Sequence, residues 1–217
     1  MPMKSNREYR NMVLEIVSEE NRDENNEERK LVAGYASTFN EPYMLYEDED
    51  VVFSETVDAN AFNEADMSDV IMQYNHEGRV FARISNNTLS VRPDEKGLFI
   101  EADLGGTEIG RELYDEIRGG YTDKMSFGFT VSRDRYDEET GTDGRQYIVR
   151  TIEGIRKVYD VSAVSIPAND GTSISIRNLA DGVIERVKAE RLEAERIALE
   201  QKRLEVRAKA IKSGGNK

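Results

Sequence analysis

The sequence contains no cysteine, which excludes disulfide bonds, thiol catalysis and metal sites built on thiolates. It contains a single histidine, His76, which disfavours a zinc site because such sites draw on several His or Cys ligands. It has no run of about 18 apolar residues, so we expect no membrane span. Residues 1–8 lack the apolar segment of a secretory signal. We therefore expect a protein without metal, cofactor or membrane partner.

The net charge of −13 is unevenly distributed along the 217 residues. Residues 177–217 carry 11 basic and 7 acidic side chains, whereas residues 1–176 carry 19 basic and 36 acidic side chains. A body this acidic disfavours nucleic acid as a partner. Residues 41–70 hold 10 acidic side chains and no Lys or Arg, which is typical of a solvated connection.

Short apolar runs separated by turn residues indicate a body made mainly of strands. Thr107 can cap a helix over residues 107–118 that ends at Gly119, and a shorter helix is expected near residues 61–67. Residues 140–144 are expected to form a hairpin tip. The predicted strands are residues 10–17, 31–39, 70–74, 88–92, 98–104, 124–133, 156–165 and 172–176. This spacing predicts a β-barrel or a β-sandwich with a few helices.

The predicted strand over residues 124–133 has two unlike faces. Large apolar side chains alternate with small residues, so that Ser126 lies on a face that leaves room beside its hydroxyl. A nucleophile needs such room. The same pattern also fits a polar residue on a half-exposed strand.

From about residue 179 the pattern changes to a heptad. Positions 183, 187, 190, 194, 197, 201, 204, 208 and 211 form a seam with two polar interruptions, flanked by Glu, Arg and Lys. The seam fits an oligomerisation arm or a helix for a partner, and equally a charged solvated helix. We therefore divide the chain into a body over residues 1–177 and a charged helical tail over residues 178–217.

His76 follows the predicted strand over residues 70–74 and has the only side chain with an unperturbed pKa near neutrality. A single histidine is more often a surface residue without a catalytic role. If it lies next to a nucleophilic serine, and if a third group orients its ring, it can act as the general base.

Five segments occur in an order that resembles the prohead proteases of tailed bacteriophages, of the HK97 type. They are GYASTFN at residues 34–40, ETVDANAF at 55–62, YNH at 74–76, KMSFGF at 124–129 and DVSAVSIPAN at 160–169. One position departs from the pattern, since Asn60 stands where the family usually has glycine. The resemblance covers residues 32–176.

The resemblance implies a serine endopeptidase distantly similar to the herpesvirus assemblin proteases, with a closed, mostly antiparallel barrel ringed by a few helices. It implies Ser126 as nucleophile, His76 as general base and then acid, and Asp160 as the carboxylate that orients the ring. Glu153 is the alternative to Asp160. Without the resemblance, Asp160 also fits a residue that pairs with a nearby Arg or Lys, or one that merely precedes the strand.

The substrates implied by the resemblance are the major capsid protein, the scaffold protein and the protease itself. Cleavage would take place inside the procapsid, in the host cytoplasm. The rival hypothesis is a non-catalytic capsid-assembly or scaffolding protein that keeps the same fold, a role that the heptad tail and the acidic body would suit.

Overall fold

The computed structural model describes residues 7–13, 29–165, 182, 185–190 and 192–204. Its elements are mainly strands. They are β1 (Glu8–Val13), β2 (Leu31–Thr38), β3 (Tyr43–Glu47), β4 (Val51–Val57), β5 (Ile71–Tyr74), β6 (Glu77–Arg83), the 3₁₀ turn η1 (Ile84–Asn86), β7 (Leu89–Pro93), β8 (Gly97–Asp103), α1 (Glu108–Arg118), β9 (Lys124–Thr140) and β10 (Gln146–Val164). Residues 185–190 and 192–204 are helical as well.

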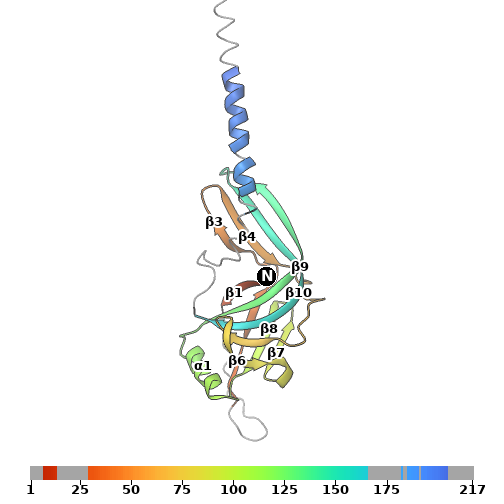
Figure 1. Cartoon of the computed structure of the whole chain (residues 1–217), viewed down its shortest axis with the longest axis vertical. Coiled ribbons are helices and arrows are strands. Elements are labelled where there is room, and N and C mark those ends of the chain that lie inside the picture. Colours follow the sequence, from red (N-terminus) through yellow and green to blue (C-terminus); the bar gives the residue numbers. More distant parts are fainter. Residues whose placement is uncertain (1–6, 14–28, 166–181, 183–184, 191, 205–217) are drawn as a thin grey trace, which may run out of the picture.

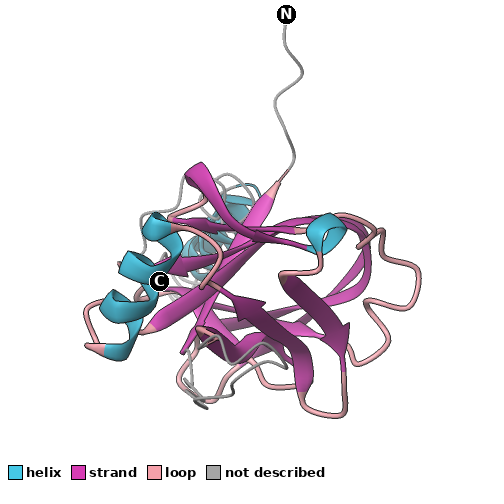
Figure 2. Cartoon of the chain, turned by 90° about the horizontal axis from the view of Figure 1, so that it is seen from below, coloured by secondary structure: helices cyan, strands magenta, loops and turns pink. Residues whose placement is uncertain are grey.

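These strands form two sheets (Figure 1). A seven-stranded sheet has the order β1-β9-β10-β4-β3, and β5 joins it on β10 with β6 beyond β5. A three-stranded sheet has the order β2-β8-β7. The main apolar core includes side chains of β2, β8, β9 and α1, such as Val32, Ile100, Phe127 and Leu113. Strands make up most of the body, and α1 lies at one side of it (Figure 2).

The expected closed barrel is wrong. Closure would require every edge strand to find a partner. Among the described residues, β1, β3 and β6 each pair on one side only, and so do β2 and β7 of the smaller sheet. The mainly β character is confirmed, but the sheets are open.

Strand β10 organises the larger sheet because it changes partners along its length. Its residues 146–152 pair in parallel with β4, and its residues 160–163 pair in parallel with β5. Along its other edge it runs antiparallel to β9, with register shifts between Ile152 and Asp160. Bulges of this kind bend a strand and redirect its side chains.

The acidic stretch over residues 41–70 is not the loop that its charge predicted. It contains the edge strand β3 and the buried strand β4. On β4, Val51, Phe53, Glu55 and Val57 are buried in alternation. The sequence did not predict β4, because Glu55 interrupts the alternation of apolar residues that is typical of a half-buried strand. The short helix expected near residues 61–67 is also wrong, since turns and an isolated bridge at Asp66 occupy that segment.

Other local predictions are confirmed. Thr107 caps α1 by accepting from the backbone N–H of Gly110 at 3.1 Å, and α1 ends at Arg118. The turn at residues 141–145 joins β9 to β10, and β5 ends two residues before His76. The predicted strand over residues 172–176 and part of the first predicted strand lie outside the described residues.

A buried charge network holds β1, β4 and β10 together. Glu55 is completely buried and accepts from Arg10 Nε at 2.5 Å and from Arg150 Nη1 at 2.8 Å. Tyr43 also donates to Glu55, and Arg150 contacts Glu8 at 2.6 Å. Burial alone would raise the pKa of Glu55, but the charge of Arg10 and its hydrogen bond outweigh this, and the pKa lies below its ordinary value.

A second apolar cluster lies where the C-terminal helical residues 185–190 pack against β3, β4 and β10. Val187 of the helix packs there with Leu45, Val51, Phe53 and Ile148. Lys188 contacts Asp48 at 2.6 Å. No helix in the described part of the chain is long and apolar enough to span a membrane.

We predict that Glu55→Gln lowers the free energy of unfolding by about 3 kcal/mol, because two buried guanidinium groups lose the one counter-ion that is itself completely buried. Glu47→Gln is the matched control. Glu47 is 45% exposed in its ion pair with Arg145, and its loss should cost less than about 1 kcal/mol. Urea denaturation at pH 7 measures both. Equal losses in the two variants would contradict a structural role for the buried network.

The same variant tests the acid dependence. A carboxylate whose pKa is lowered by folding contributes stability above its unfolded pKa, and this stability is lost as the pH falls through the folded pKa. The wild-type protein should therefore lose stability as the pH falls below about 4, and Glu55→Gln should lack this part of the loss.

Candidate active site

Ser126 lies near the start of β9, between two neighbouring strands. It stands opposite Asn11 of β1 and Ser162 of β10. Met125 and Phe127 point to the other face and are completely buried. Ser126 itself is also completely buried, so the alternative of a half-exposed polar position is wrong. Both faces of the strand are covered here.

Asp160 and Ser162 lie on β10 directly across from this part of β9. Asp160 stands opposite Gly128, and Ser162 stands opposite Ser126. Paired residues in a sheet project from the same face, so the two β10 side chains share the face of Ser126. A register shift between Val158 and Asp160 sets this arrangement. Gly128 carries no side chain, which leaves space beside the carboxylate.

His76 is placed by a tight hairpin between β5 and β6. Tyr74 pairs with Glu77 across the two-residue turn formed by Asn75 and His76. Both turn residues are left-handed, with φ of 50° and 62°, as a type I′ turn requires. Non-glycine residues are uncommon in this conformation, and surrounding contacts must hold them there.

Strand β10 supplies those contacts. The backbone N–H of Asn75 donates to the carbonyl of Ala163 at 3.0 Å, and that of His76 donates to Ser162 Oγ at 3.2 Å. The side-chain oxygen of Asn75 accepts from the N–H of Ser165 at 3.2 Å. The turn that carries the histidine is therefore attached to the strand that carries Asp160.

The three predicted side chains form one chain of contacts. His76 Nε2 lies 2.6 Å from Ser126 Oγ, and His76 Nδ1 lies 2.5 Å from Asp160 Oδ1. Because an ionised carboxylate only accepts, Nδ1 must carry the proton toward Asp160. Nε2 is then free of a proton and can accept that of the serine hydroxyl. Chemically, this arrangement can activate a hydroxyl as a nucleophile.

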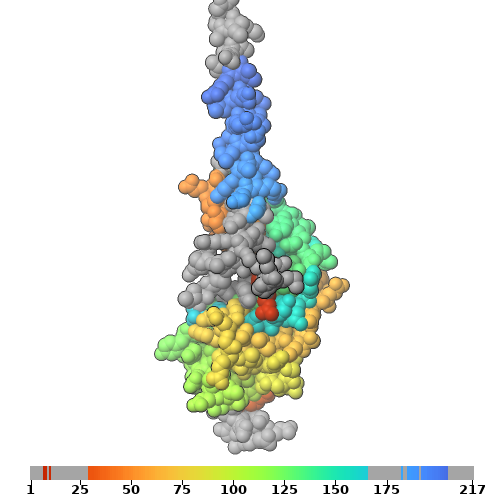
Figure 3. Space-filling view, viewed as in Figure 1, coloured from red at the N-terminus to blue at the C-terminus, as the bar shows by residue number. Residues whose placement is uncertain are grey.

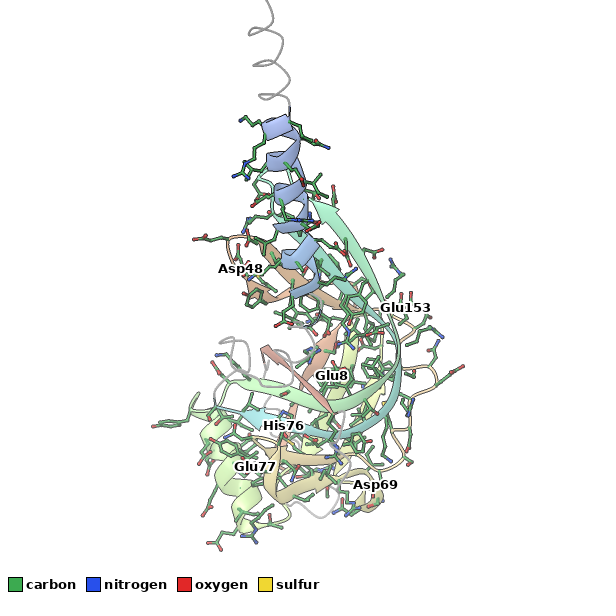
Figure 4. The ribbon with its side chains drawn as sticks, turned by 45° about the horizontal axis from the view of Figure 1, so that its top comes forward. Glu8, Asp48, Asp69, His76, Glu77 and Glu153 are labelled. Atoms are coloured by element: carbon green, nitrogen blue, oxygen red, sulfur yellow. The ribbon has the colours of Figure 1, made fainter. Side chains whose placement is uncertain are left out.

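Glu153, the alternative carboxylate, lies elsewhere. Its two oxygens contact Arg133 Nε and Arg135 Nε, each at 3.2 Å, and its side chain is 31% exposed. Figure 4 shows Glu153 well away from His76 on the ribbon. The geometry therefore favours Asp160 as the partner of the imidazole.

Ser162 is the residue of this site to which sequence reasoning assigned no role. It is completely buried, accepts from the backbone N–H of His76 and donates to Asp160 Oδ1 at 3.0 Å. It thus connects the histidine turn to the carboxylate. The spacing of Asp160 and Ser162 could have predicted that the two side chains lie together, since residues two apart on a strand share a face.

The site offers little to a metal ion. Among the described residues, no group of three or more His, Cys, Asp or Glu side chains is arranged to hold one.

His76 and Ser126 differ in accessibility. The His76 side chain is 16% exposed, whereas Ser126 is completely buried. A substrate carbonyl therefore reaches Ser126 Oγ only after neighbouring atoms move aside.

Two comparisons with known proteins found similar proteins. A sequence model of the caudovirus prohead serine protease family matches residues 16–186 of this chain. Among solved structures, the capsid assembly protease gp21 of bacteriophage T4 matches 74% of this chain and 98% of its own, with 11% sequence identity and a TM-score of 0.43. No curated protein matches the chain.

We predict that Asp160→Asn slows labelling of Ser126 by a fluorophosphonate probe by about 10³-fold or more, because the amide no longer stabilises the protonated imidazole. Glu153→Gln should label within about twofold of the wild-type rate, since its carboxylate contacts only arginines. The measurement is the labelling rate by intact mass, with circular dichroism to verify folding. A loss in Glu153→Gln with none in Asp160→Asn would reverse the assignment.

Proposed function

The chain belongs to the caudovirus prohead serine protease family, and from this premise we propose that it is the serine endopeptidase of capsid maturation in a tailed phage. Its proposed substrates are the major capsid protein, the scaffold protein and the protease itself, cleaved inside the procapsid. The observation that carries the proposal is the position of the His76 ring, within hydrogen-bond distance of both Ser126 Oγ and Asp160 Oδ1.

In the proposed first half-reaction, Ser126 Oγ forms a bond to the carbonyl carbon of the scissile peptide, and its proton passes to His76 Nε2. Asp160 stabilises the resulting imidazolium through Nδ1–H. When the tetrahedral intermediate collapses, the C–N bond breaks and His76 gives the proton to the departing amine. The peptide is left as an ester on Ser126.

In the second half-reaction, a water molecule takes the place of the amine. His76 removes its proton as it attacks the ester carbon, and then returns that proton to Ser126 Oγ as the ester bond breaks. The carboxyl product leaves and the enzyme is regenerated. Ser162 has a positioning role in this scheme, because it holds both the histidine backbone and Asp160.

The second candidate is a non-catalytic capsid-assembly or scaffolding protein with the same fold. The burial of Ser126 is the observation that favours it, because a nucleophile must reach its substrate. The intact set of Ser126, His76 and Asp160 argues against it. A probe, like a substrate, reaches Ser126 Oγ only when the neighbouring atoms move aside, so absence of His76-dependent labelling in the folded wild-type protein would favour this candidate.

We predict that co-expression with the cognate capsid and scaffold proteins yields cleaved products, and that Ser126→Ala and His76→Ala each abolish them. Removing the nucleophile or the base should lower the rate by on the order of 10⁶-fold. Ser132→Ala, an exposed serine on the same strand, is the matched control and should process normally. Mass spectrometry of the capsid protein reads the outcome, and equal processing in all four proteins would eliminate the proposal.

We also propose that the C-terminal helix drives self-association. Figure 3 shows that the helix, drawn in blue, projects away from the rest of the molecule beyond the end at which Val187 packs. Ile197 and Leu204, seven residues apart on the heptad seam, are 46% and 60% exposed. Exposed apolar side chains at this spacing fit a coiled coil with a second copy of the chain.

We predict that Ile197→Glu with Leu204→Glu reduces the protein to a monomer at concentrations where the wild type self-associates. Leu192→Glu with Leu199→Glu is the control, because this pair has the same spacing but lies about 140° around the helix from the seam. Sedimentation equilibrium gives the oligomeric state. A wild-type monomer, or equal dissociation of both double variants, would contradict the proposed seam.

A further inference from the structure

The sheet face that carries Ser126 extends along β9 beyond the candidate active site. Ser126, Gly128 and Thr130 lie on this face, because they alternate with completely buried core residues of the strand. Thr130 is four residues from Ser126, a distance of roughly 13 Å on an extended strand. Lys157 of β10 stands opposite Thr130, so its side chain lies on the same face.

A half-buried cation, Arg7, lies at the edge of this face. Arg7 directly precedes β1, whose register with β9 brings it level with Thr130. Its guanidinium carbon lies 3.7 Å from the ring centre of Tyr159, which is the additional residue that β10 inserts directly before Asp160. The bulge that brings the Asp160 carboxylate to the imidazole therefore also holds the ring on which Arg7 stacks.

Two donor groups in this part of the face lack an acceptor. Within the described residues Arg7 has no ion-pair partner, whereas Lys157 is paired with Asp66 at 2.6 Å. The Thr130 hydroxyl is buried and, in the same part of the chain, has no hydrogen-bond partner. A buried polar group without a partner costs free energy. A carboxylate suits both groups, because it only accepts hydrogen bonds and has two oxygens to offer.

The position of His76 indicates where a substrate lies on this face. β10 runs on one side of Ser126 and β1 on the other. The turn that carries His76 is hydrogen-bonded to β10, so the imidazole reaches Ser126 Oγ from that side. A carbonyl group cannot share the space of the ring, and we expect it above β9 and β1. An extended peptide aligned with these strands then passes over Gly128, which has no side chain, toward Arg7.

We infer that Arg7, stacked on Tyr159, forms a substrate subsite for an Asp or Glu side chain. The inference rests on the proposed function and adds a substrate preference to it. A guanidinium group pairs with a carboxylate in a bidentate geometry, and the contact with the ring holds the guanidinium in place. A lysine or arginine of the substrate would be repelled.

The strand registers also limit where in the substrate the acidic residue lies. An extended peptide advances about 3.3 Å per residue, and roughly 13 Å separates the level of Arg7 from that of Ser126. The acidic residue should therefore lie about three to five residues from the cleaved bond, and not at the bond itself. Its side of the bond follows from the cleavage products.

The test is a specificity profile of the full-length protein on a tryptic peptide library of a bacterial proteome. The Ser126-dependent cleavage sites should show Asp and Glu enriched at one position about three to five residues from the bond. For the best peptide, replacing that acidic residue by its amide keeps the shape and removes the charge. We expect kcat/KM to fall about fivefold in the wild type, as one half-buried charge pair would give, and this ratio should shrink toward one at about 1 M salt.

Arg7→Gln should bring the ratio of the acidic to the amide peptide close to one, chiefly by slowing cleavage of the acidic peptide. Arg7→Glu should reverse the preference, so that a lysine at the same position is favoured over the acidic residue. Arg92→Gln is the matched control and should keep the full ratio. Arg92 also stacks on an aromatic ring, 4.6 Å from the centre of Phe99, but it lies on the smaller sheet.

Two results would overturn the subsite and leave the proposed protease standing. One is Ser126-dependent cleavage without an acidic preference at these positions, and the other is an unchanged ratio in Arg7→Gln. If no cleavage depends on Ser126, the proposed function is overturned, and the subsite with it.

Discussion

The pairing of β9 with β10 is the constraint on which the candidate site depends. It places Ser126 opposite Ser162 and Asp160 opposite Gly128, so that the hydroxyl and the carboxylate project from one face. Along its other edge, β10 pairs in parallel with β5, and β5 ends two residues before His76. One long strand therefore determines the position of all three side chains, and the register shift before Asp160 decides that its carboxylate faces the site.

The polar contacts around the site have a second role, which is to hold an unfavourable backbone in place. His76 and Asn75 both have positive φ values, and neither is glycine. Ala163 and Ser162 accept the backbone N–H groups of this turn, which compensates for the strain. The position of the His76 imidazole thus depends on these few contacts with β10.

The local elements were predictable where a single pattern dominated. The capped helix α1, the strand that ends before His76 and the alternating large and small residues after Lys124 all have short-range signals that act within one element. Strands β3 and β4 were missed because their sequence is acidic and the inward row of β4 includes Glu55. A buried carboxylate is stable there only because Arg10 and Arg150 come from distant parts of the chain. No local pattern contains that information.

The sequence by itself determined the chemistry that is available to this protein: one imidazole, no thiol, and five ordered segments that identify the family. It left the third member of the constellation open between Asp160 and Glu153, because both are acidic and such a constellation is defined in space and not by sequence spacing. Only the tertiary structure separated them. The bulge in β10 and the pairing with β5 bring Asp160 to the imidazole, whereas Glu153 contacts two arginines of β9. The open sheets and the burial of Ser126 are likewise tertiary, since each depends on strands that meet only after the chain has folded.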